Sequence, residues 1–349
     1  MTAHSVHPAA IYVAAFAIAA AVSALATPLI VRLAIRLGIV DDDGHDRRMH
    51  DMPKPRVGGI AVFFGFAVAL FTMLGVALAT PVGLLPHTDQ FDAIHRLVGL
   101  LFGSLLILGV GIWDDAMQMR PRNKLIAQIV VALISMLYGF VIPGVNNPFD
   151  RNPGTNWIDF PLWIGVPLTL LWYVGMMNAI NFLDGLDGLL AGVAAISSLF
   201  LFAIAVVHAN PVVALVVVTL AGAALGFLPY NFNPARIILG DAGSLFIGYV
   251  FATVSIIGAS KTAIAISVVV PLLVLALPVL DTAAAIVRRA RSGKRISEAD
   301  RGHFHHQLIF RFGLNVRQAV LLLYAVCFVL GAVALAFSGE FTHVFRHAT

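Results

Sequence analysis

Uncharged apolar runs of membrane-spanning length recur along almost the whole of this 349-residue chain. An α-helix needs about 20 apolar residues to cross the hydrocarbon core of a bilayer. Backbone polar groups inside lipid must pair within the chain, and runs of this length favour helices. The sequence therefore predicts an all-α integral membrane protein, one polytopic domain over residues 1–349 with about ten transmembrane helices. The predicted spans are 9–31, 57–80, 97–113, 125–142, 160–180, 189–207, 212–230, 243–258, 262–287 and 318–337.

The composition and the placement of charge set the class and the orientation. Hydrophobic residues make up 60% of the chain, charged residues 11%, and the mean hydropathy of +0.92 excludes a soluble domain. Seventeen Lys and Arg residues fall on the side of the loop after the first span, against four on the other side. The positive-inside rule then puts both termini outside. The net charge of +4 reflects this topology and attraction to membrane lipids, and no nucleic-acid partner is expected. The predicted cytoplasmic loops are about 38–56, 114–124, 181–188, 231–242 and 288–317.

Carboxylates gather in three of these inner loops. Asp114 and Asp115 end one predicted span, Asp184 and Asp187 end another, and Asp241 opens a third. Short loops hold these acids at a similar depth, where they repel one another unless they share a cation. Mg²⁺ prefers oxygen ligands and usually keeps phosphate and water in its shell. For any one loop, the alternative is that its acids are simply solvated.

The acidic pair is followed by cations. Adjacent carboxylates at a helix end point in different directions, so one of Asp114 and Asp115 can bind metal while the other takes a proton. Lys124 and its basic neighbours start the next predicted span. They suit a substrate phosphate, and ordinary anchoring at the inner membrane surface is the alternative.

The other two acidic loops place amides beside carboxylates. If residues 178–188 are helical, Asn181, Asp184 and Asp187 lie three apart on one face. A polar stripe beside apolar spans is costly, which favours a functional role. Asp241 starts a predicted helix in a glycine-rich segment, where N-terminal amides suit a phosphate and a metal. Helix capping is the alternative for that position.

Three histidines crowd the last inner loop. His303, His305 and His306 follow Arg301, but the helical spacing typical of zinc sites is missing. Side chains that titrate near neutral pH beside cations suit pyrophosphate binding. A solvated loop is the alternative.

In this order the motifs resemble the polyprenyl-phosphate N-acetylhexosamine-1-phosphate transferase family, membrane enzymes that transfer a phospho-sugar from a UDP-sugar to a polyprenyl phosphate. The resemblance covers five ordered motifs from about Asp42 to Gly313, with Gly44 and Arg48 in place of the family's proline and lysine. The matching residues are Asp42, Arg47, Arg48, His50, Pro53, Pro55, Arg56, Gly58, Gly59, Asp114, Asp115, Lys124, Asn181, Asp184, Asp187, Asn231, Asp241, Asp281, Thr282, Arg288, Arg289, Asp300, His303, His305 and His306.

The resemblance implies a role for each group of residues. Asp241 is the position that binds Mg²⁺, with Mn²⁺ as a substitute, and Asn181 or a second acid helps. The catalytic positions are Asp114, Asp115 and His303. Asp114 or Asp115 either deprotonates the lipid phosphate for direct attack, which we favour, or acts as a covalent nucleophile. The nucleotide- and substrate-binding positions are Asp184, Asp187, Asn231, Lys124, Arg301, His305, His306, Asp42 and Arg56.

The histidine loop also bears on the sugar donor. Phe304 interrupts the three consecutive histidines of the branch that uses UDP-N-acetylmuramoyl-pentapeptide. This favours a UDP-N-acetylhexosamine, UDP-GlcNAc first, with undecaprenyl phosphate as acceptor, UMP as product and a cell-surface polysaccharide as destination. The resemblance implies a multi-pass protein of the bacterial inner (plasma) membrane, and it leaves a homodimer open.

Three other classes compete with this interpretation. A cation-coupled transporter would carry acids near the middle of the membrane and related halves, whereas here the acids lie at one mouth. A CDP-alcohol phosphotransferase shares the Asp187-Gly188 start of its signature, but Gly192 replaces the arginine. A non-catalytic scaffold does not need three acidic clusters on one face.

Overall fold

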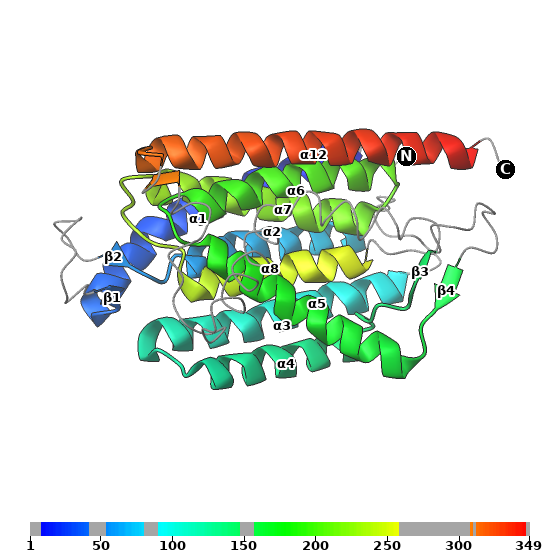
Figure 1. Ribbon diagram of the computed structural model, residues 1–349, viewed down its shortest axis with the longest axis horizontal. Helices are drawn as coiled ribbons and strands as arrows, with labels where there is room; N and C mark the ends of the chain where they lie inside the picture. The colour runs from blue at the N-terminus through cyan, green and yellow to red at the C-terminus, as the bar shows by residue number, and fades with distance from the viewer. Residues whose placement is uncertain are drawn as a thin grey trace.

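The computed structural model describes residues 8–41, 54–79, 90–146, 157–257, 308–309 and 312–346. Over these residues the chain forms a bundle of α-helices that run roughly along the long axis of the molecule (Figure 1). The helices are α1 (Pro8–Leu37), α2 (Gly59–Ala79), α3 (Gln90–Met117), α4 (Pro121–Leu137), α5 (Leu162–Leu183), α6 (Leu189–Val207), α7 (Pro211–Asn231), α8 (Gly240–Ile257) and α12 (Val316–Arg346).

The helices match the apolar runs of the sequence. Nine of the ten predicted spans coincide with a helix, and the remaining one, 262–287 with Asp281, lies outside the described residues. Eight of the described helices are long and apolar enough to cross a membrane. With 17 residues, α4 is shorter. A multi-pass helical membrane protein is therefore confirmed, while the number of ten spans and the outside position of both termini stay predictions.

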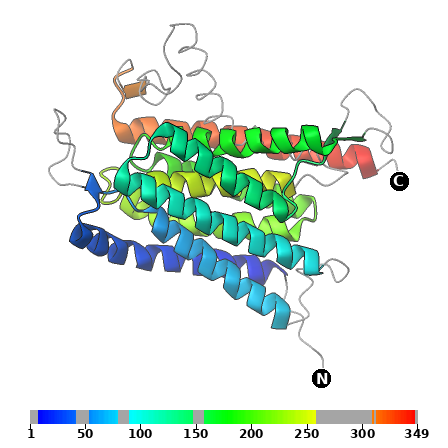
Figure 2. The ribbon, with the colours of Figure 1, turned by 90° about the horizontal axis from the view of Figure 1, so that it is seen from below.

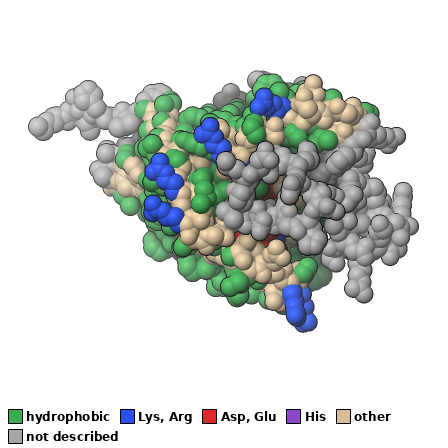
Figure 3. Space-filling model, turned by 90° about the vertical axis from the view of Figure 1, so that its left-hand side faces the viewer, with side chains coloured by type: hydrophobic (Ala, Val, Ile, Leu, Met, Phe, Trp, Pro, Cys, Tyr) green, Lys and Arg blue, Asp and Glu red, His purple; other side chains and the backbone are tan. Residues whose placement is uncertain are grey.

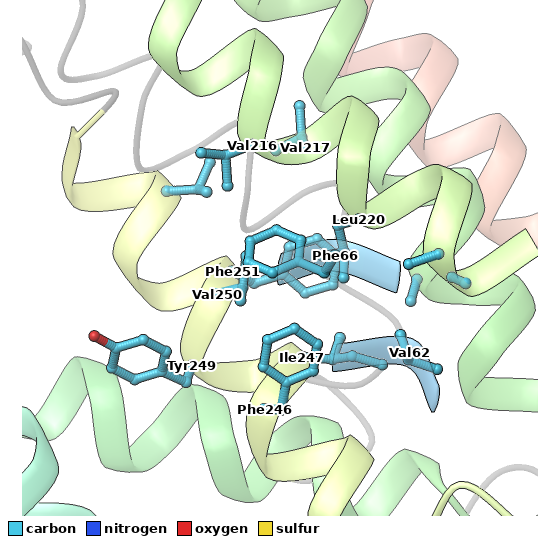
Figure 4. Packing of buried hydrophobic residues seen from close by; sticks show 14 of the residues in the cluster. Val62, Phe66, Val216, Val217, Leu220, Phe246, Ile247, Tyr249, Val250 and Phe251 are labelled. Carbon is cyan, nitrogen blue, oxygen red and sulfur yellow. The ribbon is translucent and has the colours of Figure 1, made fainter. Parts of the chain in front are cut away.

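Helix α8 lies at the centre of the bundle. It contacts α2, α3, α5 and α7, and every residue from Ala242 to Ile256 is buried. Figures 1 and 2 both show it enclosed by its neighbours. Aromatic packing fills the contact with α2, where the rings of Phe63 and Phe66 lie edge-on to Phe246 at 5.5 and 5.4 Å. Phe66 and Phe246 are seen in Figure 4. A helix that is apolar all round is typical of a bundle core.

Glycines let two helices approach the start of α8 unusually closely. A Cβ atom added to Gly59 would lie 2.1 Å from the Gly243 nitrogen, and one added to Gly111 would lie 2.4 Å from Cα of Ala242. Any larger residue at either position would push the helices apart. The C-terminal end of α3 and the N-terminal end of α2 therefore meet the first turn of α8.

Two short antiparallel ribbons accompany the helices, and no pattern in the sequence predicted them. Strands β1 (Val40–Asp41) and β2 (Lys54–Pro55) pair at one end of the bundle, and β3 (Gly144–Asn146) pairs with β4 (Trp157–Asp159). The end of β2 is hydrogen-bonded to the segment that leads into α8, where the Ile238 N–H donates to Pro55 O at 2.8 Å. This pairing places Pro55 and the residues that follow it beside the start of α8.

Candidate active site

The predicted acidic and amide residues meet at one end of the bundle. Asp114 and Asp115 lie in the last turn of α3, Asn181 lies in the last turn of α5, and Asp241 lies in the first turn of α8. Lys124 extends from the first turn of α4. Seen from this end, Lys and Arg side chains are spread around the face, and a few acidic atoms show near its centre (Figure 3).

Lys124 stands among three oxygen ligands. Its Nζ donates to Asp114 Oδ2 at 2.9 Å and to Asn181 Oδ1 at 3.2 Å, and it also forms an ion pair with Asp241. Asn181 Nδ2 in turn donates to Asp241 Oδ1 and to Ser244 Oγ, both at 2.7 Å. We call Asp114, Lys124, Asn181 and Asp241 the lysine cluster. Four helices thus converge on a single ammonium group.

Asp114 and Asp115 have different surroundings, as adjacent residues at a helix end should. Asp115 accepts hydrogen bonds from the backbone N–H groups of Asp241 at 2.8 Å and Ala242 at 2.9 Å. It therefore caps the N-terminus of α8 from outside that helix, where a negative charge is favourable. Asp114 faces Lys124 and accepts from the backbone N–H of Met119 at 2.7 Å.

Asp184 follows the last residue of α5 and lies close to other acids. Burial raises the pKa of its carboxyl to about 8, and the negative charges of Asp241 and Asp115 add to this shift. The positive charge of Arg56 acts in the opposite direction. With this pKa the Asp184 carboxyl holds its proton at neutral pH unless a cation replaces it.

The prediction of one helical face for Asn181, Asp184 and Asp187 is wrong. Helix α5 ends at Leu183, and the chain turns before α6 begins. The glycines of this segment explain the break, because Gly188 takes the left-handed conformation with φ of 84°. Asp187 consequently has different hydrogen-bond partners from Asn181 and lies outside the lysine cluster.

Asp187 and Asn231 tie the loops of the site together. One oxygen of Asp187 accepts from Lys54 Nζ at 3.1 Å, from Asn233 Nδ2 at 3.2 Å and from the Ala235 nitrogen at 3.0 Å. Asn231 is 3% exposed, and its amide bonds to Gly188 and Ile237 of the backbone. These hydrogen bonds hold the loops around the site in place.

Several residues of the site were not predicted from the sequence. Lys54 and Ser244 contact Asp187 and Asn181, respectively, and Asn233 braces Asp187. Lys54 lies directly before Pro55 and Arg56 of the first inner motif, and this position could have identified it as a residue of the site. The other two lie within recognised motifs but were not assigned to the site. Gly240 has a φ of 74° and leaves room for the main-chain oxygen of Arg56. A Cβ atom added to Gly240 would lie 1.8 Å from that oxygen.

Part of the predicted site lies outside the described residues. These positions are Asp42, Arg301, His303, His305 and His306. Among the described residues, no group of three or more His, Cys, Asp or Glu side chains is arranged to hold a metal ion. The lysine cluster nonetheless offers two carboxylates and an amide oxygen, which are the donors that Mg²⁺ prefers. The donor chemistry fits, and the magnesium site stays a prediction.

The chain is similar to a known family of transferases and to bacterial proteins named as such. The model of glycosyl transferase family 4 matches residues 97–259, which span the lysine cluster. A Bacillus subtilis protein named "Probable undecaprenyl-phosphate N-acetylglucosaminyl 1-phosphate transferase" is 33% identical over 328 residues, which cover 93% of this chain and 84% of that protein. A "Decaprenyl-phosphate N-acetylglucosaminephosphotransferase" of Mycobacterium tuberculosis is 35% identical, covering 84% of this chain and 74% of that protein.

A relative from the muramoyl branch is also similar. A "Phospho-N-acetylmuramoyl-pentapeptide-transferase" of Limosilactobacillus reuteri is 31% identical over 269 residues. The match covers 73% of this chain and 75% of that protein, so it leaves more of the chain unmatched than the two relatives above.

Proposed function

The chain belongs to the polyprenyl-phosphate N-acetylhexosamine-1-phosphate transferase family, and from this premise we propose that it transfers N-acetylglucosamine 1-phosphate from UDP-N-acetylglucosamine to undecaprenyl phosphate. UMP leaves, and the lipid-linked sugar starts a cell-surface polysaccharide. The observation that carries this proposal is the lysine cluster, where acids from α3 and α8 meet a cation from α4 and an amide from α5. Phosphoryl transfer depends mainly on such positioning and on charge stabilisation.

The position of the cluster suits two substrates of opposite character. Polyprenyl phosphate carries its charge at the membrane surface, and a nucleotide sugar arrives from water. The cluster lies at the ends of apolar helices, on the end of the bundle that also carries Lys54, Arg56, Arg120 and Arg317. The excess of cations in this region supports a cytoplasmic orientation in the bacterial plasma membrane.

The oxygen ligands support a Mg²⁺ requirement, with Mn²⁺ as a substitute. Asp241 is the principal ligand in this proposal, and Asn181 completes the pair. Mg²⁺ bound there would neutralise charge on the pyrophosphate and on the departing UMP. Lys124 and Arg56 bind phosphate oxygens, and Asp184 and Asp187 shape the nucleotide side of the site.

The geometry divides the work between the two adjacent acids. Both oxygens of Asp115 are engaged by the first amides of α8, so a role as covalent nucleophile would cost that cap. Asp114 is bonded to Lys124 and faces the cluster. Asp114 is therefore our candidate for the base that takes a proton from the lipid phosphate before direct attack.

One assay tests the reaction and the donor together. Purified protein is incubated with undecaprenyl phosphate, Mg²⁺ and one of three donors at equal concentration, and UMP release is followed. We expect transfer from UDP-GlcNAc and none from UDP-N-acetylmuramoyl-pentapeptide. Transfer from UDP-glucose should be weak, because this donor lacks the acetamido group and leaves the polar group of the site that binds it without a hydrogen-bond partner. Efficient use of the muramoyl donor would assign the chain to the other branch, and no UMP from any donor would refute the proposal. Asp241→Asn serves as the inactive control.

A further inference from the structure

The ammonium of Lys124 contacts both residues proposed to hold the divalent cation, Asp241 and Asn181, and also the proposed base Asp114. Asp114 Oδ2 lies 2.9 Å away and Asn181 Oδ1 3.2 Å away, with Asp241 as the third partner. We infer that Lys124 is a built-in competitor of the metal, an internal cation that fills the site until a divalent cation displaces it. This inference rests on the proposed function, since it concerns the proposed magnesium site.

Buried packing, rather than a flexible loop, places Lys124 there. Gln128 lies four residues after Lys124 on α4, and Asn178 lies three residues before Asn181 on α5. Asn178 Nδ2 donates to Gln128 Oε1 at 2.9 Å, and Gln128 is 1% exposed. This second contact lies one turn along both helices from the first. It locks α4 against α5 so that Lys124 faces Asn181.

The charges of the cluster explain why the two cations exclude each other. Two carboxylates close together repel, and one ammonium that bonds to both offsets this repulsion. The side chains are 16% exposed for Lys124, 10% for Asp114 and 27% for Asp241, so water screens the cluster only in part. A divalent cation on the same oxygens would stand within a few ångströms of the ammonium. Like charges so close repel each other, so we expect Lys124 to give up its contacts with the shared oxygens when the metal binds.

The movement has a use in the proposed reaction. A lysine side chain has a flexible four-carbon stem and three donors that reorient freely. Once displaced from Asp114 and Asp241, the ammonium becomes available to an anionic phosphate beside the metal. The protein would thus present its free cation to the donor only after the divalent cation is bound.

Competition predicts an unusual effect of removing the lysine. If the ammonium fills the site roughly nine-tenths of the time, it weakens the apparent affinity for a divalent cation by about tenfold. Lys124→Met keeps the apolar stem and removes the charge, so it should bind Mg²⁺ about tenfold or more tightly while losing turnover. A lysine that merely supports the metal site would have the opposite effect on affinity.

Calorimetric titration of the purified full-length protein with Mg²⁺ alone, without substrates, measures this affinity. The matched control is Lys54→Met, which removes a nearby charge paired with Asp187 and leaves the lysine cluster intact. We expect tighter Mg²⁺ binding for Lys124→Met and near wild-type binding for Lys54→Met. Equal or weaker binding in Lys124→Met, or no measurable binding in either wild type or Lys124→Met, would overturn the inference.

A second measurement uses the wild-type protein and does not depend on how the variant folds. The sequence holds four lysines, Lys54, Lys124, Lys261 and Lys294, so amine acetylation can be followed for each by mass spectrometry. Labelling of Lys124 should rise when Mg²⁺ is added, relative to Lys54 as internal reference, and unchanged labelling contradicts displacement. Neither readout requires turnover. Failure of all three sugar donors would therefore sink the proposed reaction alone, and an active enzyme without these two effects would sink this inference alone.

Discussion

Replacement of Asp115 by Asn should separate a stability effect from a catalytic one. Asp115 accepts two hydrogen bonds from the first amides of α8, at 2.8 and 2.9 Å. Asn keeps one acceptor, turns an NH₂ group toward the other amide and removes the negative charge at a helix N-terminus. Loss of a charged hydrogen bond and of the helix-dipole interaction together cost about 2–3 kcal/mol of unfolding free energy.

The adjacent acid supplies the matched comparison. Asp114→Asn also loses a charged hydrogen bond, but Lys124 keeps its ion pair with Asp241 and no helix N-terminus loses its cap, so its unfolding free energy should fall by less than that of Asp115→Asn. Both variants should lose turnover. Asp114→Asn removes the proposed base, and Asp115→Asn weakens the cap of α8 and so displaces Asp241. Thermal unfolding in detergent and UMP release, measured on the same preparations, check both statements. Equal melting temperatures for the two variants would refute the capping role of Asp115.

Four further outcomes are expected. Asp241→Asn should collapse Mg²⁺ affinity and turnover while the fold survives, and near wild-type turnover in the presence of a chelator would contradict the metal assignment. Gly240→Ala should cost roughly 2 kcal/mol or more in thermal unfolding, because its φ is 74° and its Cβ would meet a main-chain oxygen at 1.8 Å; Gly109→Ala, with nothing within 4 Å, is the control. The pKa of Asp184, raised from 3.8 to about 8, favours the protonated folded state, so its contribution to stability without metal is full below pH 3.8 and is lost as pH rises to about 8. Unfolding measured across that window should show a flatter profile for Asp184→Asn. His303→Ala should lower turnover without any zinc in the wild-type protein, and stoichiometric zinc by elemental analysis would contradict this.

The sequence predicted the helices well and their ends less well. Apolar runs fix where a helix crosses lipid, but they do not mark where it stops in water. Helix α3 begins at Gln90, seven residues before the predicted span, and the ion pair of Asp92 with Arg96 at 2.9 Å lies on this added turn. Such a pair four residues apart stabilises a helix that has left the apolar region.

The convergence of the acids was predictable, whereas the partner of each acid was not. Short loops between spans require Asp114, Asn181 and Asp241 to lie at a similar depth, and the structure brings them together. Which cation they share depends on how α4 packs against α5, a contact between residues 50 or more positions apart. Asp187 illustrates the same limit, since the spacing of three suggested a helical face and the glycine-rich turn prevented it.

The burial of α8 has a consequence for how the protein is made. Its hydroxyl side chains Ser244, Tyr249, Thr253 and Ser255 bond within the bundle or lie buried there, and facing lipid they would be poorly satisfied. The chain emerges from the ribosome in order, so α2, α3, α5 and α7 are in the membrane before α8. Helix α8 must then pack between these four helices, which are made before it. Asp241 arrives with it, and a nascent chain that ends at α7 cannot assemble the lysine cluster.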